Sequence, residues 1–281
     1  MRKHQCRQDE NPGAPLRPSL RGLAAFFIAI ATVATAACTA TRPDERLHST
    51  LWVQASAEYA VITRQVFKMA KDEIDQDLAS ANRVRPLAII VDVDQTILDN
   101  SGQTARSIIA GSGFRSADWT EWVNEASAPA VPGALEYLQY VAAQGVAVFY
   151  VTNRSAEKED ATRRNLEQLG FPLNPDTDMI LTRLEQPGWT RDKASRRQWL
   201  ASRFEVLQLL GDELSDFLSL PPGTDAETRL HMAQSHHEKW GRQWFMLPNP
   251  IYGSWERALT PDGSSIYDAP MELKIRSLKT Q

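Results

Sequence analysis

Three runs of apolar, mostly branched residues limit the folds open to this chain more than any other feature of its sequence. The runs are Leu87–Val93, Val146–Val151 and Glu205–Leu210, and each is nearly continuous rather than alternating. Such a run is typical of a strand that is buried on both faces of a parallel sheet. Shorter runs predict further strands at Met179–Thr182 and Trp244–Leu247.

The segments between these runs carry helix signals, although residues 100–131 are less regular. Apolar residues from Tyr59 to Leu78 recur at spacings of three and four, which predicts an amphipathic helix of about 30 residues. Ser49 or Ser56 is its expected N-cap. Strands that alternate with helices predict an α/β fold, with a parallel sheet and helices on both faces. Further helices are expected at Pro132–Gln144, Ser155–Leu169, Asp192–Ser202, and from a capping box of Thr224 and Glu227 to about Trp240.

The first 37 residues predict an export signal that is not part of the fold. Five basic residues precede Leu23–Ala37, an uncharged run too short to span a bilayer comfortably but typical of a signal peptide. Cys38 follows small residues, as at the cleavage site of a bacterial lipoprotein, where the cysteine is acylated. Ordinary signal cleavage is the alternative. We expect a signal at 1–37, a tether at 38–48 and a folded domain at 49–281.

Charge and cysteine content limit the partners that the protein can bind and the chemistry that it can perform. The chain has a net charge of −4, and removal of the five basic and two acidic residues of the signal leaves −7. An acidic surface disfavours nucleic-acid polymers and anionic lipid faces as partners. Because Cys6 lies in the signal, the mature chain keeps only Cys38, which excludes an intrachain disulfide and a cysteine-rich metal site.

Polar residues end the three long strands, which is where open α/β sheets bind their ligands. They are Asp92 and Asp94, Thr152 and Asn153, and Asp212 with Asp216. Acids held together repel one another, and an oxygen-only set of ligands favours a hard cation such as Mg²⁺. A carboxylate beside Mg²⁺ is suited to phosphoryl transfer through an aspartyl-phosphate. Any one of these acids alone would be a helix N-cap more often than a ligand, so only the joint pattern favours this interpretation.

Longer words along the chain resemble the bacterial class C acid phosphatases of the haloacid dehalogenase (HAD) superfamily. The words are VDVDQTILDNS at 91–101, DWTEWV at 118–123, PGALEYLQY at 132–140, VFYVTNR at 148–154, GDELSDF at 211–217 and LPNPIYGSWE at 247–256. The resemblance implies a phosphoric monoester hydrolase with an HAD-like Rossmannoid sheet. A small helical lid from about 49–80 and 100–131 is a further expectation, because these segments flank the first catalytic strand.

The resemblance implies roles for the residues at the strand ends. Asp92 would be the nucleophile that attacks phosphorus. Asp94 would protonate the leaving oxygen and then activate the water that cleaves the aspartyl-phosphate. Thr152, and less directly Asn153, would hold the phosphoryl oxygens.

Further roles concern the metal and the substrate. Mg²⁺ would be bound by the Asp92 carboxylate, the Asp94 backbone carbonyl and Asp212. Asp216 would bind the metal through water or orient Lys193. Lys193 would neutralise the phosphoryl charge, with Arg191 as a rival for that role. Trp119 and Tyr252 would stack on a nucleotide base, and packing in the core or lid is the alternative reading of both.

Three functions stay open at this stage. The favoured one is a Mg²⁺-dependent acid phosphatase and 5′-nucleotidase of the cell envelope. It would be anchored in the outer membrane through Cys38, or be periplasmic or secreted if Cys38 is not lipidated. A broad phosphatase that scavenges organic phosphate shares the chemistry. A non-catalytic envelope lipoprotein, for example a haem binder, is the alternative from another class, although His231, His236 and His237 are expected on a solvated surface. A homodimer is among the oligomeric states left open.

Overall fold

The computed structural model describes residues 44–79, 84–260, 269 and 271–280. The chain divides into two units, Met1–Pro43 and Asp44–Gln281, and all the described residues belong to the second. The expected signal at 1–37 and Cys38 lie outside the described residues. Within the described ranges, no helix is both long and apolar enough to cross a membrane.

Five parallel strands form one sheet in the order β3-β2-β1-β4-β5, which confirms the predicted parallel sheet. The central strand β1 is almost fully buried, as its continuous apolar run requires. Because all the strands run in the same direction, their carboxyl ends share one edge of the sheet. The strands are β1 (Leu87–Val91), β2 (Ala147–Ser155), β3 (Ile180–Arg183), β4 (Glu205–Gly211) and β5 (Trp244–Met246).

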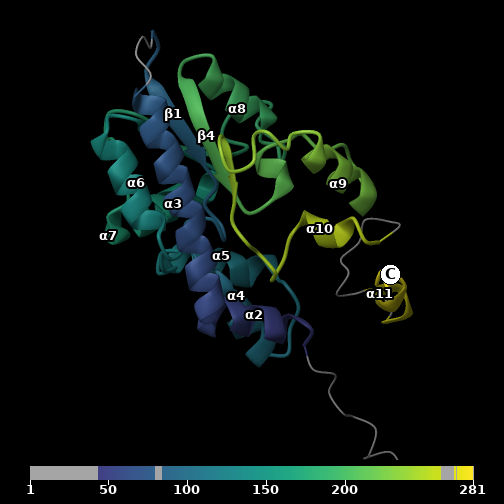
Figure 1. Ribbon diagram of the computed structural model, residues 1–281. Coiled ribbons are helices and arrows are strands. Elements are labelled where there is room, and N and C mark those ends of the chain that lie inside the picture. Colours follow the sequence, from purple (N-terminus) through teal and green to yellow (C-terminus); the bar gives the residue numbers. More distant parts are fainter. Residues whose placement is uncertain (1–43, 80–83, 261–268, 270, 281) are drawn as a thin grey trace, which may run out of the picture. The chain divides into compact units, whose positions relative to one another are not determined.

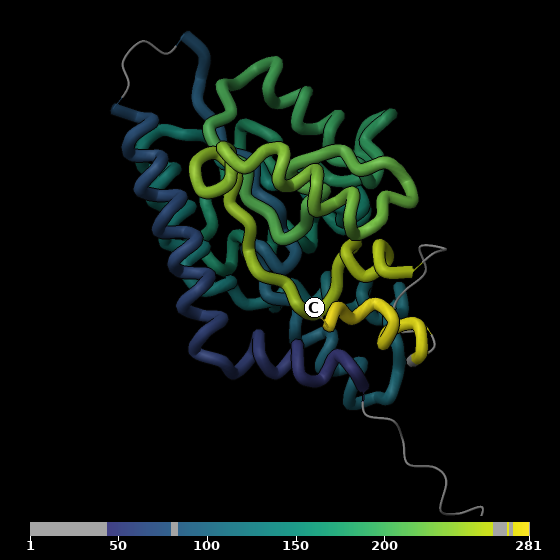
Figure 2. The backbone as a smooth tube through the Cα atoms, turned by 45° about the vertical axis from the view of Figure 1, so that its right-hand side comes forward, coloured from purple at the N-terminus to yellow at the C-terminus, as the bar shows by residue number. Residues whose placement is uncertain are grey.

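Helices cover both faces of this sheet. On one face, α3 (Ala57–Ala79) packs against α6 (Ala134–Ala143) and against β4 and β5. On the other face, α8 (Ala194–Ala201) packs against β4, as Figures 1 and 2 show from two directions. Further elements along the chain are η1 (Ala156–Lys158), α7 (Glu159–Leu169), η2 (Leu214–Asp216), α9 (Ala226–Gln234), α10 (Ser254–Arg257) and α11 (Met271–Arg276).

The predicted helix of about 30 residues is two helices that meet at Ser56. They are α2 (Arg46–Ala55) and α3. Ser56 has an extended backbone, and its Oγ accepts a hydrogen bond from the Tyr59 N–H at 3.1 Å. Ser56 is therefore an N-cap, as expected, whereas Ser49 lies inside α2.

Residues 100–131 contain two helices that the sequence did not resolve, α4 (Ser101–Ile109) and α5 (Ser116–Glu125). α4 packs against both α2 and α5, so these three helices lie together. In contrast, α3 packs on the sheet. A lid made from both 49–80 and 100–131 stays a prediction.

The predicted capping box of Thr224 and Glu227 is wrong. Asp225 caps α9 by accepting a hydrogen bond from the Thr228 N–H at 2.8 Å. Thr224 Oγ1 instead donates to the Pro221 carbonyl at 2.6 Å. A carboxylate competes well for the free N–H groups and the positive dipole of a helix start, so the helix begins one residue later than predicted. It ends at Gln234, before the predicted end near Trp240.

Candidate active site

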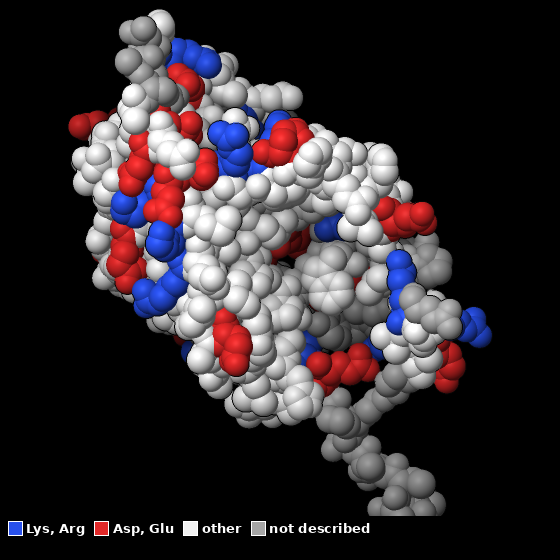
Figure 3. Space-filling model, in the orientation of Figure 1, with Lys and Arg blue, Asp and Glu red and all other residues white. Residues whose placement is uncertain are grey.

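The carboxyl ends of β1, β2 and β4 bring the predicted polar residues to one edge of the sheet. Asp92 directly follows β1 and Asp212 directly follows β4, and these two strands are neighbours in the sheet. Thr152 and Asn153 lie in the last part of β2, the other neighbour of β1. Figure 3 shows a hollow in this view of the surface, with acidic and basic atoms in its depth.

Three acids converge at this edge. Asp92, Asp212 and Asp216 each offer an oxygen atom, and these oxygens all lie within 4.8 Å of one another. Thr96 Oγ1 lies between two of them, 3.2 Å from Asp92 Oδ2 and 3.4 Å from Asp212 Oδ1. In the described part of the chain, this is the group of three side chains that could hold a metal ion. All its donors are oxygens, which fits a hard divalent cation.

Gly211 makes room for one of these acids. A Cβ atom at this position would lie 2.3 Å from Asp216 Oδ2, so no larger residue fits without displacing the carboxylate. The Glu213 N–H donates to the same oxygen at 2.9 Å and fixes the turn after β4. The Gly-Asp-x-x-x-Asp spacing thus folds Asp216 back against the end of the strand that precedes it.

Lys193 is the cation at the centre of the acid group. Its Nζ donates to Asp92 Oδ1 and lies 2.7 Å from Asp216 Oδ1. Burial alone would lower the pKa of Lys193, but Asp216 and Asp92 together raise it above its ordinary value, so the amine stays charged. The rival residue, Arg191, is exposed. The structure therefore places Lys193, and not Arg191, against the predicted nucleophile.

One ammonium group does not neutralise three carboxylates, of which Asp92 and Asp216 are buried and Asp212 is half-buried. Burial raises the pKa of Asp92 to about 7, opposed by Lys193 and reinforced by Asp216. Burial and the nearby Asp92 charge also raise the pKa of Asp212 well above its usual value, although Asn249 Nδ2 donates to Asp212 Oδ2 at 2.7 Å. A divalent cation among the acids would favour their charged forms and reverse these shifts. The residues present therefore fit such an ion.

Asp94 lies outside this group and has its own cationic partner. Arg154 Nε and Nη2 donate to Asp94 Oδ1 at 3.0 and 2.8 Å, and Asn100 Nδ2 donates to the same oxygen at 2.9 Å. Thr152 Oγ1 donates to Asp94 Oδ2 at 3.4 Å. Arg154 is itself held by Thr162, whose Oγ1 accepts a hydrogen bond from Nη1 at 3.0 Å. Four donor atoms thus fix the orientation of the Asp94 carboxylate.

The two predicted stacking residues border the site. The Arg154 guanidinium lies 5.6 Å from the centre of the Trp119 ring, which links that ring to Asp94. The Tyr252 N–H donates to Asn249 Oδ1 at 3.4 Å, and Asn249 also donates to Asp212, which links Tyr252 to the acids. Burial and the charge of Asp212 raise the pKa of Tyr252 well above its usual value. Both rings also pack against the hydrophobic core. Their role towards a base stays a prediction.

Several residues of the site were not predicted from the sequence. Arg154 and Asn249 lie inside the words VFYVTNR and LPNPIYGSWE, so a signal for them was present. Arg196 and Arg197 of α8 had none, because basic residues on a short helix are usually solvated. Arg196 is instead fully buried, and its Nη2 donates to Asn153 Oδ1 at 2.9 Å.

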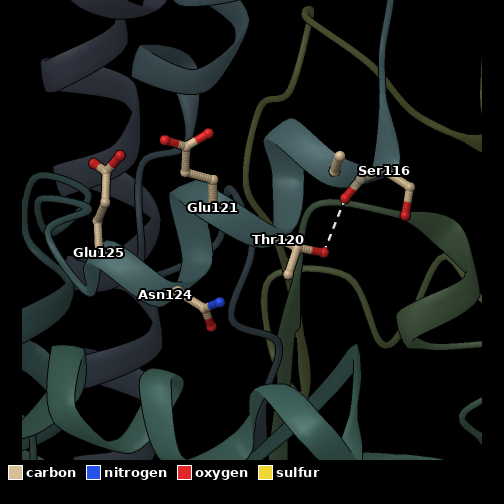
Figure 4. Close-up of a pocket in the computed structure, with 6 residues that line it drawn as sticks. Ser116, Thr120, Glu121, Asn124 and Glu125 are labelled. Atoms are coloured by element: carbon tan, nitrogen blue, oxygen red, sulfur yellow. Dashed lines mark hydrogen bonds between the residues drawn. The ribbon is translucent and has the colours of Figure 1, made fainter.

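A second hollow lies along the outer side of α5. Its volume is about 710 Å³, and Figure 4 shows side chains of this one helix around it, with Thr120 Oγ1 donating to the Ser116 carbonyl at 2.9 Å. Glu121 and Glu125 add negative charge there. Its lining contains none of the acids of the metal group. The chemistry therefore belongs to the edge of the sheet and not to this hollow.

Comparisons with known proteins agree with this architecture. The family model described as HAD superfamily, subfamily IIIB (acid phosphatase) matches residues 28–255. Two structures of the class C acid phosphatase from Bacillus anthracis, one with tungstate bound, match with a TM-score of 0.76 and 30% identity. These matches cover 85% of this chain and 98% of the Bacillus chain.

Curated plant relatives match over a shorter stretch. Acid phosphatase 1 of Solanum lycopersicum is 29% identical over 166 residues, which are 58% of this chain and 57% of that protein. Stem 28 kDa glycoprotein of Glycine max is 25% identical over 167 residues, 58% of each chain. The chain thus spans little more than half the length of these relatives.

The parallel sheet and the acids at its carboxyl edge define a hydrolase of the HAD type. The chain belongs to subfamily IIIB of the HAD superfamily, the family of the class C acid phosphatases, which are phosphoric monoester hydrolases. The family resemblance found in the sequence is thereby confirmed.

The raised pKa of Asp92 predicts how the metal-free protein responds to pH. Between the ordinary pKa of 3.8 and about 7, the folded state keeps a proton on Asp92 that the unfolded state releases. The stability that this group contributes is complete below 3.8 and is lost as the pH rises towards 7. We expect the metal-free wild type to lose free energy of unfolding, relative to Asp92→Asn, across this window. Urea unfolding with EDTA at several pH values measures it, and parallel curves for the two proteins would contradict it.

Proposed function

We infer that this chain is a Mg²⁺-dependent phosphomonoesterase that acts through an aspartyl-phosphate on Asp92. The observation that carries this proposal is the meeting of Asp92 with Lys193, Asp212 and Asp216 at one edge of the sheet. Family membership supports the reaction class. The tungstate bound by the Bacillus anthracis relative supports a site for a tetrahedral oxyanion.

The reaction needs one nucleophile and one proton carrier. A carboxylate oxygen of Asp92 attacks phosphorus, and the bond from phosphorus to the ester oxygen breaks as Asp94 gives that oxygen its proton. Asp94 then takes a proton from water, the water oxygen attacks phosphorus, and the bond to Asp92 breaks to release phosphate. A divalent cation at the three acids would polarise the phosphoryl oxygens.

The neighbours of the two acids support this division of roles. Lys193 is charged and touches Asp92, so it can stabilise negative charge that develops on the phosphoryl group. Arg154, Asn100 and Thr152 hold Asp94 in one orientation, as a proton carrier requires. Thr152 and Asn153 lie beside these groups at the end of β2 and would bind phosphoryl oxygens.

The central prediction concerns the nucleophile. Asp92→Asn keeps the size of the side chain but removes the attacking oxygen anion, so we expect phosphate release to fall by at least about a thousandfold. EDTA should inactivate the wild type, and Mg²⁺ should restore it. Asp72→Asn is the control, because Asp72 is exposed on α3 and its carboxylate pairs with the exposed Lys68. An Asp92→Asn variant with normal turnover would instead favour the binding-protein alternative.

The proposed substrate is a 5′-nucleotide, with general organic phosphate esters as the alternative. The Trp119 ring lies near Arg154, and Tyr252 is linked to Asp212 through Asn249. A flat aromatic face that stacks on a base contributes about 1–3 kcal/mol with little preference between bases.

Replacing each aromatic by alanine tests this substrate class. Trp119→Ala and Tyr252→Ala should lower kcat/KM for a 5′-nucleotide by about 5- to 100-fold more than for a simple aryl phosphate, because only the nucleotide has a base to lose. Phe114→Ala removes an exposed ring that precedes α5 and should affect both substrates equally little. Equal losses on both substrates in the Trp119 and Tyr252 variants would favour the broad phosphatase.

The proposed location is the cell envelope, with the chain attached to the outer membrane through acylated Cys38. The proposal is supported by the basic segment, the apolar run and the small residues before that cysteine. Cys38→Ser should move the enzyme from the membrane fraction to the soluble fraction without changing its activity. Membrane retention of this variant, or an unmodified Cys38 in the mass spectrum of the wild type, would contradict lipidation.

A further inference from the structure

The short helix α8 lies between the two halves of the site. On one side is the end of β2, which carries Thr152 and Asn153. On the other side is the turn after β4, which carries Asp216. Lys193 immediately precedes α8 and contacts Asp92 and Asp216, and two consecutive arginines follow it within the helix. These arginines bind different halves of the site.

Arg196 binds the half that would hold the phosphoryl group. Its Nη1 donates to the Thr152 carbonyl and, at 3.3 Å, to the Leu181 carbonyl. Its Nη2 donates to Asn153 Oδ1 and to the Thr190 carbonyl, each at 2.9 Å. The side chain is fully buried, and burial lowers its pKa to about 10. A guanidinium in this position joins β2, β3 and the loop before Lys193, which a single ammonium could not do.

The bond to Asn153 also decides what that amide can offer a substrate. Because Asn153 Oδ1 accepts from a cation, the amide is held in the orientation that leaves its two Nδ2–H donors for another acceptor. A phosphoryl oxygen is such an acceptor. Arg196 would therefore set the donor direction of Asn153, the residue that is proposed to bind a phosphoryl oxygen.

Arg197 binds the other half. Its Nη1 donates to the Ser215 carbonyl at 3.1 Å and to the Asp216 carbonyl at 2.9 Å. Both carbonyls belong to the turn that carries the third acid of the metal group. Burial lowers the pKa of Arg197, opposed by Asp192 and Asp216. The backbone of an expected metal ligand, Asp216, is thus held by the Arg197 side chain.

We propose that Arg196 and Arg197 are positioning residues with separate duties, Arg196 for the phosphoryl pocket and Arg197 for the divalent cation. The inference rests on the proposed function and adds which residues set each affinity. Residues that support a metal ligand from behind commonly change metal affinity by about 10- to 100-fold when they are replaced. If the two arginines had only a structural role, replacing them would lower the free energy of unfolding and leave the affinities for Mg²⁺ and phosphate unchanged.

Two constants separate these duties. The dissociation constant for Mg²⁺ is measured by calorimetry on the full chain without substrate, and the inhibition constant for inorganic phosphate is measured at saturating Mg²⁺. We expect Arg197→Met to weaken Mg²⁺ binding by about tenfold or more, and to leave the phosphate constant within about twofold. Arg196→Lys should weaken phosphate binding by about tenfold and leave Mg²⁺ binding unchanged. The lysine ammonium keeps the buried positive charge but lacks the planar set of N–H donors with which the guanidinium binds several acceptors.

Two further variants complete the design. Arg203→Met is the control, because Arg203 is an exposed arginine just after α8 that packs on Trp199, and neither constant should change. Asn153→Asp tests the orientation of the Asn153 amide without altering the size of the side chain. If Arg196→Lys does not fold, this variant tests the proposed effect on phosphate binding in its place. It should weaken phosphate binding more than Mg²⁺ binding, because a carboxylate oxygen replaces the two donors.

Each failure points to one proposal. A wild type that neither binds Mg²⁺ nor releases phosphate would overturn the proposed function. An active wild type whose Arg196 and Arg197 variants change both constants by the same factor, or change neither, would overturn the separate duties and leave the function standing. Arg197→Lys should recover part of the lost Mg²⁺ affinity, since it can still reach one carbonyl.

Discussion

The repulsion among three carboxylates at one edge of the sheet is the constraint on which the rest of the site depends. Asp92, Asp212 and Asp216 bring up to three negative charges within one small space, and Lys193 supplies one positive charge. Such a group is stable only if bound protons or a further cation compensate the excess negative charge. A fold that keeps it must therefore take up protons when metal-free or bind a divalent ion, and the oxygen ligands favour the ion.

The same constraint separates two chemically equivalent side chains. Asp92 and Asp94 are two residues apart at the end of one strand, yet Asp92 joins the acid group while Asp94 pairs with Arg154. The first is therefore subject to the charge of the other acids and of any bound ion. The second is balanced locally and held by hydrogen bonds. Two acids with different surroundings can act as nucleophile and proton carrier in one reaction.

The sequence predicted those parts of the protein that depend on local pattern. Buried strands of a parallel sheet are continuous apolar runs, and polar residues at their carboxyl ends meet at one edge whatever lies between them. This is why the sequence alone predicted that Asp92, Thr152 and Asp212 lie close together. The break at Ser56, the separation of α4 from α5 and the cap at Asp225 depend on competition between neighbouring hydrogen bonds, which the pattern of apolar residues does not record.

The partners of the predicted residues escaped prediction for a different reason. Arg154 and Asp94 are 60 residues apart, and Asn249 and Asp212 are 37 apart, so only the folded chain places them side by side. The sequence predicts an exposed position for Arg196, because the four acceptors that surround it are brought together only in the folded chain. A buried guanidinium without a carboxylate partner is tolerated only where backbone carbonyls converge, and they converge here because β2, β3 and the loop before α8 all end at the same edge. The topology that gathers the acids thus also creates the place for the cation that holds the Asn153 amide.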